Sequence, residues 1–345
     1  MATAVVARPV GHGTVVAAEF RPHPLLRAAH LQTIVPTLLR PLPALGLEIE
    51  TRATADGDVV EWGWFGRPAP GQPVAVLVHG LTGGFASKYL RGTARALQRS
   101  GWAGLILQLR GAGAQPNRRP RAYHQGDTED LHAALQHLRD TYPTSCIAAV
   151  GWSLGGNVVL KAAGEAGVDF AADQVAAASV PFALEPCVAR LNRGFSRIYQ
   201  RRMLRDLQSS AQAKAAAMSL PEDVDLPATL QAANFRQYDT AWTAPLNGFA
   251  DAADYYARCA CGPYLAGIRR PTLIVHSRDD PFMTPEMIPS ASHLAPQVRL
   301  EVSERGGHVG FVAAGPGGRP VMWLEQRLAH WLNASRVSVT APSDR

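Results

Sequence analysis

The residues of this 345-residue chain best suited to chemistry lie in the run Gly-Trp-Ser-Leu-Gly at positions 151–155. An apolar run at 147–150 precedes it, and a helical pattern at 157–166 follows. A serine on a tight turn between a strand and a helix has its hydroxyl exposed above the sheet, and small residues two positions away on each side leave room for neighbouring backbone. The pattern therefore predicts that Ser153 is a nucleophile and that the chemistry is acyl transfer.

A serine hydroxyl is a weak nucleophile at neutral pH, so it needs a histidine base and a carboxylate that orients this base. His308 lies in a glycine-rich stretch at 306–310, after the last expected strand, and is the candidate base. Asp279 and Asp280 follow the expected strand at 272–276, and either could reach the histidine. Asp280 is favoured because the Pro-Phe step after it resembles the turn that points the acid inward in serine hydrolases. Asp279 would then cap the turn or support the site.

The oxyanion that forms during acyl transfer needs N–H donors. The Leu154 N–H follows the serine at the start of the expected helix, where partial positive charge gathers. The second donor should come from the loop His-Gly-Leu-Thr-Gly-Gly at 79–84, which follows the apolar run at 74–78. There the Leu81 N–H is the natural donor, because glycines let the backbone approach the site. His79 is expected to support this loop rather than to act as the base.

We expect neither a metal nor an organic cofactor. The four cysteines, at positions 146, 187, 259 and 261, are few for this length. The Cys-x-Cys pair has no second Cys or His pair nearby at zinc spacing. The run Gly-Ala-Gly at 111–113 is only part of a dinucleotide-binding fingerprint. The cysteine usage favours reduced thiols and a cytoplasmic location.

Apolar runs alternate with helical patterns along the chain, which favours an α/β fold with a mostly parallel, doubly wound sheet flanked by helices. A hairpin of two edge strands is expected first, around an Asp-Gly turn, at 47–54 and 59–65. Further strands are expected at 74–78, 105–109, 147–150, 174–180, 272–276 and 298–302, and helices at 88–99, 128–141, 157–166 and 322–331.

The long gap before the strand at 272–276 is helical and rich in arginine, so residues 182–262 are interpreted as a helical lid inserted into the sheet domain. The core would then comprise 18–181 and 263–335, between flexible termini at 1–17 and 336–345. Within the lid, arginines recur at helical spacing at positions 190, 193, 197, 201 and 205. We interpret them as the solvated face of a lid helix that packs its other face. The alternative is a basic amphipathic helix on a lipid surface.

The formal net charge of +6 raises the question of anionic partners. No basic motif interleaved with aromatic residues is present, so nucleic acid is not expected. Arg8 and Pro9 interrupt the apolar N-terminal stretch, and no run reaches membrane-spanning length, so we expect neither a signal peptide nor an integral membrane segment. The expected partner is a small-molecule ester. Peripheral lipid contact through the lid is left open, and so is the oligomeric state.

Several further stretches span most of the chain: His30-Leu31-Gln32-Thr33, His79-Gly80-Leu81, Arg110-Gly111, Pro116-Asn117-Arg118, Glu185-Pro186-Cys187, Gly248-Phe249-Ala250-Asp251, Tyr255-Tyr256, Asp279-Asp280-Pro281-Phe282 and Gly306-Gly307-His308-Val309-Gly310-Phe311. With these and the serine motif, the chain resembles the YheT-type hydrolases (AB hydrolase family 4) of the α/β-hydrolase superfamily, which are related to ABHD1/ABHD3-like lipid hydrolases and yeast medium-chain ester synthases. The resemblance implies an α/β-hydrolase fold with an eight-stranded sheet, and Ser153, Asp280 and His308 as the catalytic triad.

The expected function is hydrolysis of carboxylic esters through an acyl-enzyme, without a cofactor. Short- to medium-chain acyl esters, with monoacylglycerols among them, are what the resemblance implies. One alternative is an acyltransferase that passes the acyl group to an alcohol. An alternative of another class is a non-catalytic binding or lipid-surface protein on a hydrolase scaffold.

Overall fold

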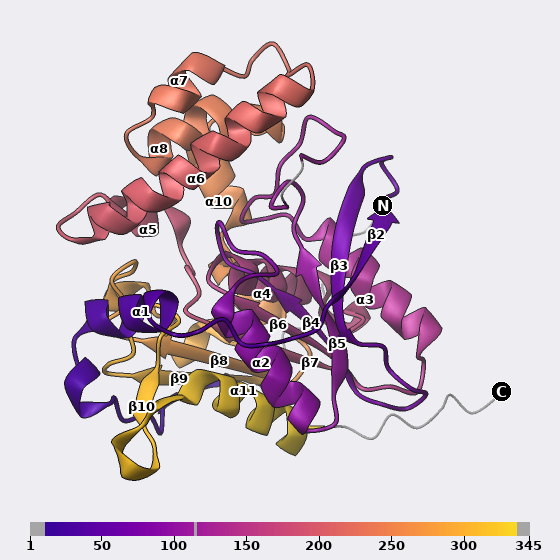
Figure 1. The fold of residues 1–345 in the computed structure, drawn as a ribbon, viewed down its shortest axis with the longest axis vertical. Helices are drawn as coiled ribbons and strands as arrows, with labels where there is room; N and C mark the ends of the chain where they lie inside the picture. The colour runs from indigo at the N-terminus through magenta and orange to yellow at the C-terminus, as the bar shows by residue number, and fades with distance from the viewer. Residues whose placement is uncertain (1–10, 114–115, 337–345) are drawn as a thin grey trace.

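The computed structural model describes residues 11–113 and 116–336, and a nine-stranded sheet runs through it in the order β1-β9-β8-β7-β6-β4-β5-β3-β2 (Figure 1). All neighbouring strands from β1 to β5 in this order are parallel, whereas β3 and β2 are antiparallel to their neighbours. The expectation of a mostly parallel sheet is therefore confirmed. The strands are β1 (Thr14–Ala17), β2 (Glu48–Ala53), β3 (Val59–Gly66), β4 (Val74–Val78), β5 (Ala103–Gln108), β6 (Ile147–Trp152), β7 (Gln174–Ala178), β8 (Thr272–Ser277) and β9 (Val298–Ser303).

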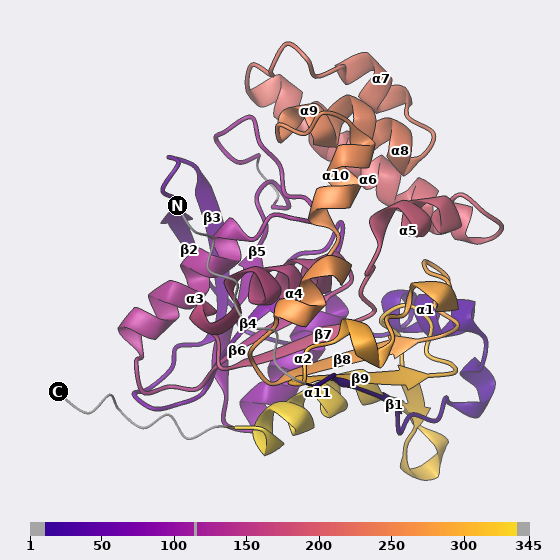
Figure 2. The same cartoon turned by 180° about the vertical axis from the view of Figure 1, so that it is seen from behind.

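Helices cover both faces of this sheet, as Figure 2 shows from behind. On one face lie α3 (Glu129–Thr141) and α4 (Leu154–Ala166); on the other lie α2 (Lys88–Arg99) and α11 (Trp323–Ala334). Val74, Val76 and Val78 of β4 join the apolar cluster on the first face, and Ala75 and Leu77 join the cluster on the second. Because a parallel strand is buried on both faces, its sequence is an uninterrupted apolar run, which is why these strands could be predicted.

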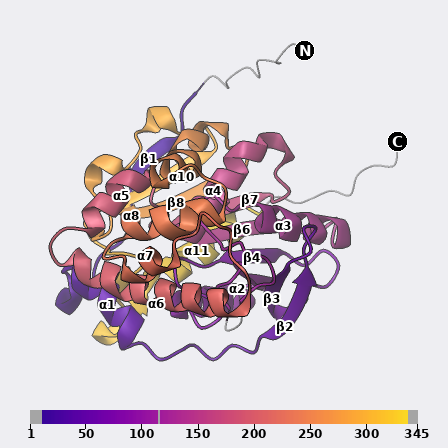
Figure 3. The ribbon, with the colours of Figure 1, turned by 90° about the horizontal axis from the view of Figure 1, so that it is seen from above.

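The chain between β7 and β8 forms a group of helices beyond the ends of the strands (Figures 1 and 3). We call this group, α5 to α10, the inserted helices. Most of them share an apolar cluster that includes Leu204, Phe235 and Trp242, whereas α10 packs in a second cluster with Leu184. The segments are α5 (Leu184–Leu191), α6 (Ser196–Ala217), α7 (Leu226–Gln231), α8 (Phe235–Tyr238), the π-helix η3 (Asp239–Thr243), α9 (Ala244–Leu246) and α10 (Ala252–Cys259).

Short elements flank the sheet, and among them α1 (Ala29–Leu38) and the two-stranded ribbon of β10 (Val312–Ala314) and β11 (Pro320–Met322) lie close to each other. The 3-10 helices are η1 (Pro24–Leu26), η2 (Gly167–Asp169), η4 (Gly262–Gly267), η5 (Pro285–Met287), η6 (Ala291–His293) and η7 (Pro316–Gly318). Across residues 11–113 and 116–336, no helix combines the length and the apolar character that crossing a bilayer requires.

The first strand corrects two expectations. Thr14–Ala17 forms β1, which pairs in parallel with β9, so the described sheet has nine strands rather than eight. The core therefore begins before residue 18, and residues 14–17 are not part of a flexible terminus. Of the expected termini, residues 1–10 and 337–345 lie outside the described residues.

Two further expectations were wrong in detail. The strand at 59–65 is not an edge strand, because β3 lies between β2 and β5, and only β2 is at that edge of the sheet. The arginine series does not follow one helix: α5 ends at Leu191 and α6 begins at Ser196. Gly194, between them, has a φ of 53°. The arginines keep a helical spacing across this break because the turn happens to have a matching length. The periodicity alone therefore could not reveal the break.

Candidate active site

Ser153 lies on the turn between β6 and α4, with a φ of 53° and a ψ of −121°. Such a conformation costs a non-glycine residue about 1–3 kcal/mol, so the surroundings must impose it. The Ser153 N–H donates to the Ala178 carbonyl at 2.9 Å. A Cβ on Gly151 would come within 2.2 Å of the Gly155 carbonyl oxygen, and one on Gly155 within 2.3 Å of the Val78 carbonyl oxygen. Backbone crowding therefore requires both glycines, as the sequence pattern indicates.

Three of the expected side chains meet at this turn. His308 Nε2 lies 3.0 Å from Ser153 Oγ, and His308 Nδ1 lies 2.8 Å from Asp280 Oδ2. A carboxylate accepts the Nδ1 proton, so Nε2 of the neutral ring faces the serine as an acceptor. The second Asp280 oxygen, Oδ1, accepts the Phe282 N–H at 2.8 Å, which fixes the carboxylate. This arrangement can remove the serine proton and hold the imidazole that receives it.

The loop that carries His308 is fastened to α1. Thr33 Oγ1 accepts the His308 backbone N–H at 2.9 Å. A Cβ on Gly310 would come within 2.1 Å of the Gln32 carbonyl oxygen, so only glycine fits where this loop crosses the helix. The Gln32 side chain donates to the Val312 carbonyl at 3.1 Å and accepts the Val312 N–H at 2.6 Å. The first helix thus positions a loop that lies 280 residues later in the chain.

Two side chains from the strand ends also hold this loop. Asp279 Oδ1 accepts the Gly307 N–H at 2.9 Å, and burial raises the pKa of Asp279. Ser179 Oγ accepts the Val309 N–H at 3.0 Å, and Ser179 itself has a φ of 52°. Of the two neighbouring carboxylates, Asp280 therefore faces the His308 ring and Asp279 faces the loop backbone.

An aromatic stack joins the His308 ring to the inserted helices. The Phe282 ring lies parallel to the imidazole, with 3.9 Å between the ring centroids. Tyr199 of α6 packs against Phe282 at 5.1 Å, and its hydroxyl lies 3.0 Å from His30 Nδ1 on α1. Burial raises the pKa of Tyr199 to about 12, so the phenol stays protonated at neutral pH. The inserted helices and α1 therefore both contact the surroundings of the imidazole.

The loop after β4 leaves one N–H free beside the serine. The Gly80 N–H donates to the Tyr89 hydroxyl at 2.9 Å, and the Thr82 N–H donates to the Tyr123 hydroxyl at 3.0 Å. Between them, the Leu81 N–H has no protein acceptor in the described part of the chain. The Leu154 N–H opens the first turn of α4, where N–H groups have no acceptor within the helix. Both groups are available to a ligand oxygen.

His79 ties this loop to the next strand. Its Nδ1 donates to the Gly80 carbonyl at 2.8 Å, and its Nε2 accepts the Leu109 N–H at 3.1 Å. Burial lowers the pKa of His79 to about 4, so the ring is neutral at pH 7. With both ring nitrogens engaged by backbone, His79 supports the loop, as expected from its position.

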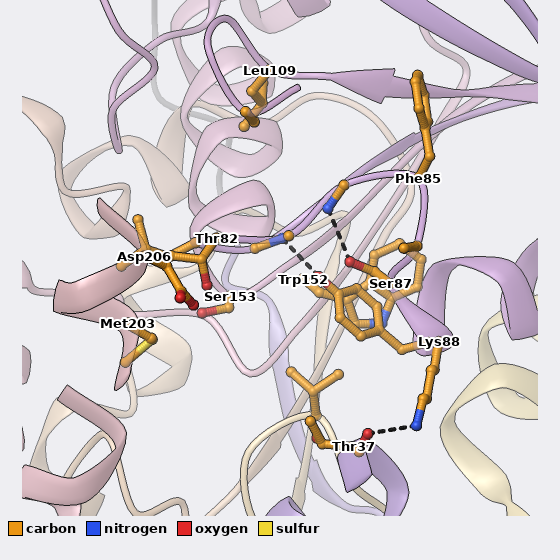
Figure 4. A pocket seen from close by; sticks show the side chains of 18 of the residues that line it. Thr37, Thr82, Phe85, Ser87, Lys88, Leu109, Trp152, Ser153, Met203 and Asp206 are labelled. Atoms are coloured by element: carbon orange, nitrogen blue, oxygen red, sulfur yellow. Dashed lines mark hydrogen bonds between the residues drawn. The ribbon is translucent and has the colours of Figure 1, made fainter. Parts of the chain in front are cut away.

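Two cavities meet at the serine. The larger, about 1060 Å³, extends from Ser153 and His308 along α1 and α2 and under the start of α6. The smaller, about 340 Å³, extends from the same two residues into the inserted helices, toward Tyr238 and Trp242. Met203 and Asp206 of α6 line both, and Figure 4 shows their side chains pointing toward the region of Ser153 and Thr82. A substrate can therefore extend away from the serine in two directions.

Sequence reasoning missed the supports of His308, namely Thr33, Gln32 and Ser179. The stretch that contains Gln32 and Thr33 stood out only through the family resemblance, and nothing in its local pattern indicates a contact with residue 308. Phe282 was part of the Asp-Asp-Pro-Phe stretch, but its stacking on the imidazole was not anticipated. Among residues 11–113 and 116–336, no group of three or more His, Cys, Asp or Glu side chains is arranged to hold a metal ion.

Comparisons with known proteins show the family and the fold. A family described as alpha/beta hydrolase fold matches residues 73–314. The chain is 40% identical to the candidate esterase YheT of Escherichia coli (strain K12), over 91% of this chain and 93% of that protein. It is 28% identical to phospholipase ABHD3 of Mus musculus, over 80% of this chain and 70% of that protein. Esterase Pf2001 of Pyrococcus furiosus has a similar fold, with a TM-score of 0.54 and 17% identity over 94% of this chain and 98% of that one.

Proposed function

Since this chain belongs to the α/β-hydrolase family and is a carboxylesterase-type hydrolase, we propose that it cleaves esters with Ser153 as nucleophile, His308 as general base and Asp280 as the orienting acid. The observation that carries the proposal is the continuous chain of contacts, 3.0 Å from Ser153 Oγ to His308 Nε2 and 2.8 Å from His308 Nδ1 to Asp280. Each role follows from the atom that faces its neighbour.

In the proposed mechanism, His308 Nε2 takes the Ser153 proton as Oγ attacks the ester carbonyl. The Leu81 and Leu154 N–H groups donate to the oxyanion of the tetrahedral intermediate. The intermediate collapses as the imidazolium gives its proton to the leaving alkoxide, which leaves an acyl group on Ser153. Water, deprotonated by the same imidazole, then releases the acid. Each oxyanion donor is worth about 3 kcal/mol of transition-state stabilisation in such sites.

The two cavities support an assignment of the two halves of the ester. The larger cavity is lined mainly by apolar groups, such as Ile34, Leu38 and Phe85, and suits the acyl chain. Its volume of about 1060 Å³ is at the upper end of the range for small-molecule pockets. This volume supports short- to medium-chain acyl groups as substrates and is also compatible with monoacylglycerols. The smaller cavity, with Tyr238 and Asp239 in its lining, suits the alcohol. The inserted helices then act as the lid, and the expected location is the cytoplasm.

The experiment that tests the proposal is hydrolysis of p-nitrophenyl esters from acetate to palmitate by the parent, Ser153→Ala and Ser145→Ala. Ser145 is a matched control, because it is buried, its hydroxyl has no partner, and it lies outside both cavities. We expect Ser153→Ala to lose turnover by about 10⁴-fold or more while Ser145→Ala keeps it. Circular dichroism checks that both variants fold.

Three other results would redirect the proposal. Ester product formed from added ethanol in preference to acid would indicate an acyltransferase. Turnover by Ser153→Ala equal to that of the parent would remove Ser153 from the mechanism. Failure of the parent to hydrolyse any ester, together with failure of a fluorophosphonate probe to label Ser153, would indicate a non-catalytic protein on a hydrolase scaffold.

A further inference from the structure

The two fully buried side chains of helix α1 are polar, whereas two of its leucines are exposed. Gln32 and Thr33 face the His308 loop and are buried. Leu31 and Leu38 are exposed, as is Leu39 directly after the helix, with 54% of Leu38 and 75% of Leu39 accessible. A surface helix of a globular protein ordinarily has the opposite arrangement, with the apolar stripe facing inward. The outer face of α1 is therefore matched to an apolar surrounding rather than to water.

The start of α6 extends this apolar surface. Phe195 and Ile198 are both exposed, with 53% of Ile198 accessible. The Phe195 ring lies 4.3 Å from the ring of His30, which neighbours Leu31 on α1. Figures 1 and 3 both show the N-terminal end of α6 beside α1. The two helices thus contribute to one continuous patch.

Arginines border the patch along α6. Arg197, Arg201, Arg202 and Arg205 are exposed, and none of them forms an ion pair with a described residue. Asp206 is the one acidic residue of α6, and its side chain lies at the junction of the two cavities. Ile198 is thus surrounded on its helix by uncompensated positive charge.

The patch also lies at the cavity that contains the serine. Leu38, Ile198 and Arg202 line the larger cavity together with Ser153. A ligand embedded in an apolar layer in front of α1 and α6 would meet this cavity directly. Apolar side chains that penetrate a headgroup layer, flanked by arginines that meet its phosphates, are the chemistry of proteins that bind membrane surfaces.

We propose that the outer face of α1 and the start of α6 form a docking surface for an anionic lipid layer. Leu31, Leu38, Leu39, Phe195 and Ile198 would enter the layer, and the arginines of α6 would face its phosphates. A second copy of this chain fits less well, because a symmetric contact would bring two arginine-bordered patches together. This proposal goes beyond the proposed ester hydrolysis and does not depend on which residues form the triad.

The test is sedimentation of the full-length Ser153→Ala protein with two kinds of vesicle, phosphatidylcholine alone and equal parts of phosphatidylcholine and phosphatidylglycerol. We expect binding to the mixed vesicles only. Leu31→Ser/Leu39→Ser should weaken it about tenfold, because two leucines no longer enter the layer. Arg197→Gln/Arg201→Gln should weaken it about thirtyfold, since each arginine near an anionic surface contributes about fivefold. None of these four residues lines the cavity of Ser153.

Matched controls remove the same chemistry elsewhere. Val168→Ser removes an apolar side chain that is comparably exposed on η2, and Arg99→Gln/Arg319→Gln removes the same charge from other exposed sites. We expect both to bind like the parent. Absence of vesicle binding by the parent would overturn the proposal. Equal losses of binding in the two double-arginine variants would also overturn it. So would a loss of binding in Arg197→Gln/Arg201→Gln without a loss in Leu31→Ser/Leu39→Ser. If the parent is a dimer and the leucine substitutions dissociate it, this face is instead the contact between two copies of the chain. Hydrolysis of p-nitrophenyl acetate, measured separately, reports on the proposed catalytic function alone.

Discussion

At the scale of single residues, one hydroxyl connects the first helix to the catalytic loop. Thr33 Oγ1 accepts the His308 N–H at 2.9 Å and donates to the Ala29 carbonyl at 2.8 Å. General-base catalysis requires the imidazole to lie within hydrogen-bond distance of the nucleophile, and small displacements lower the rate. We therefore regard Thr33 as a positioning residue, since it contacts the loop backbone and not the reacting atoms.

Replacing Thr33 by valine should lower kcat about tenfold and leave KM nearly unchanged, because an unpaired buried N–H costs roughly 1–3 kcal/mol and loosens the loop. Thr33→Ser should restore most of the activity, since it keeps the hydroxyl. The control is Thr141→Val in α3, where the hydroxyl donates to the His137 carbonyl at 2.7 Å, far from the site. Steady-state kinetics with a p-nitrophenyl ester measures the effect. Equal kcat for Thr33→Val and the parent would show that the other contacts hold the loop without this hydroxyl.

At the scale of elements, the turn from β6 to α4 has no room for a side chain at Gly155. A Cβ on Gly155 would come within 2.3 Å of the Val78 carbonyl oxygen and 2.5 Å of the His79 carbonyl oxygen. Neither contact can relax by rotation of a side chain, because both atoms are backbone oxygens, one at the end of β4 and one at the start of the loop after it. The serine turn and the loop that offers the Leu81 N–H are therefore fixed against each other.

Gly155→Ala should accordingly lower the free energy of unfolding by about 3 kcal/mol, in the range for insertion of an atom into a packed interior. Gly46→Ala is the matched control, because a Cβ there meets nothing within 4 Å. Its effect should stay within about 0.5 kcal/mol. Urea denaturation followed by fluorescence measures both. A Gly155→Ala variant as stable as the Gly46→Ala variant would contradict the crowding argument.

The burial and pairing of each element explain which elements could be predicted from the sequence. The strands β4 to β8 are buried along their whole length, so each appears as a largely apolar run, and α2 was predicted with its observed ends. By contrast, β1 is short and largely exposed, and it exists because Thr14–Ala17 pairs with β9 far along the chain. The serine, the histidine and the two aspartates follow local motifs. Thr33 acts through a contact across 275 residues, which no local pattern encodes.

At the scale of the whole molecule, the folded chain keeps histidines neutral in its interior. His79 and His276 are buried, and burial lowers the pKa of each to about 4. In the unfolded chain the pKa of a histidine is near 6.5. Between these values the unfolded chain binds protons that the folded chain does not, so the free energy of unfolding falls as the pH drops from 6.5 to 4. Below pH 4 these two groups add no further change.

Each of the two histidines should destabilise the fold by about 2 kcal/mol between pH 7 and pH 5. His276→Leu should therefore lose less stability over this interval than the parent, by about that amount. The matched control is His293→Leu, in which the substituted side chain is exposed. Urea denaturation at both pH values gives the free energies. An identical pH dependence in His276→Leu and the parent would show that His276 takes up its proton in both states alike.

The contacts of β1 with β9 and of α1 with the His308 loop constrain the order of events during synthesis. The chain leaves the ribosome from its N-terminus, yet β1 pairs with β9, and α1 holds the loop around His308. Neither early segment has its partner until residues 298–308 have emerged. The turn around Ser153 and the helices that follow it can assemble before that point. The proposed base, His308, cannot yet be positioned. Catalytic competence should thus be the last property that a nascent chain acquires, and the non-local pairing of β1 should make this closing step slow.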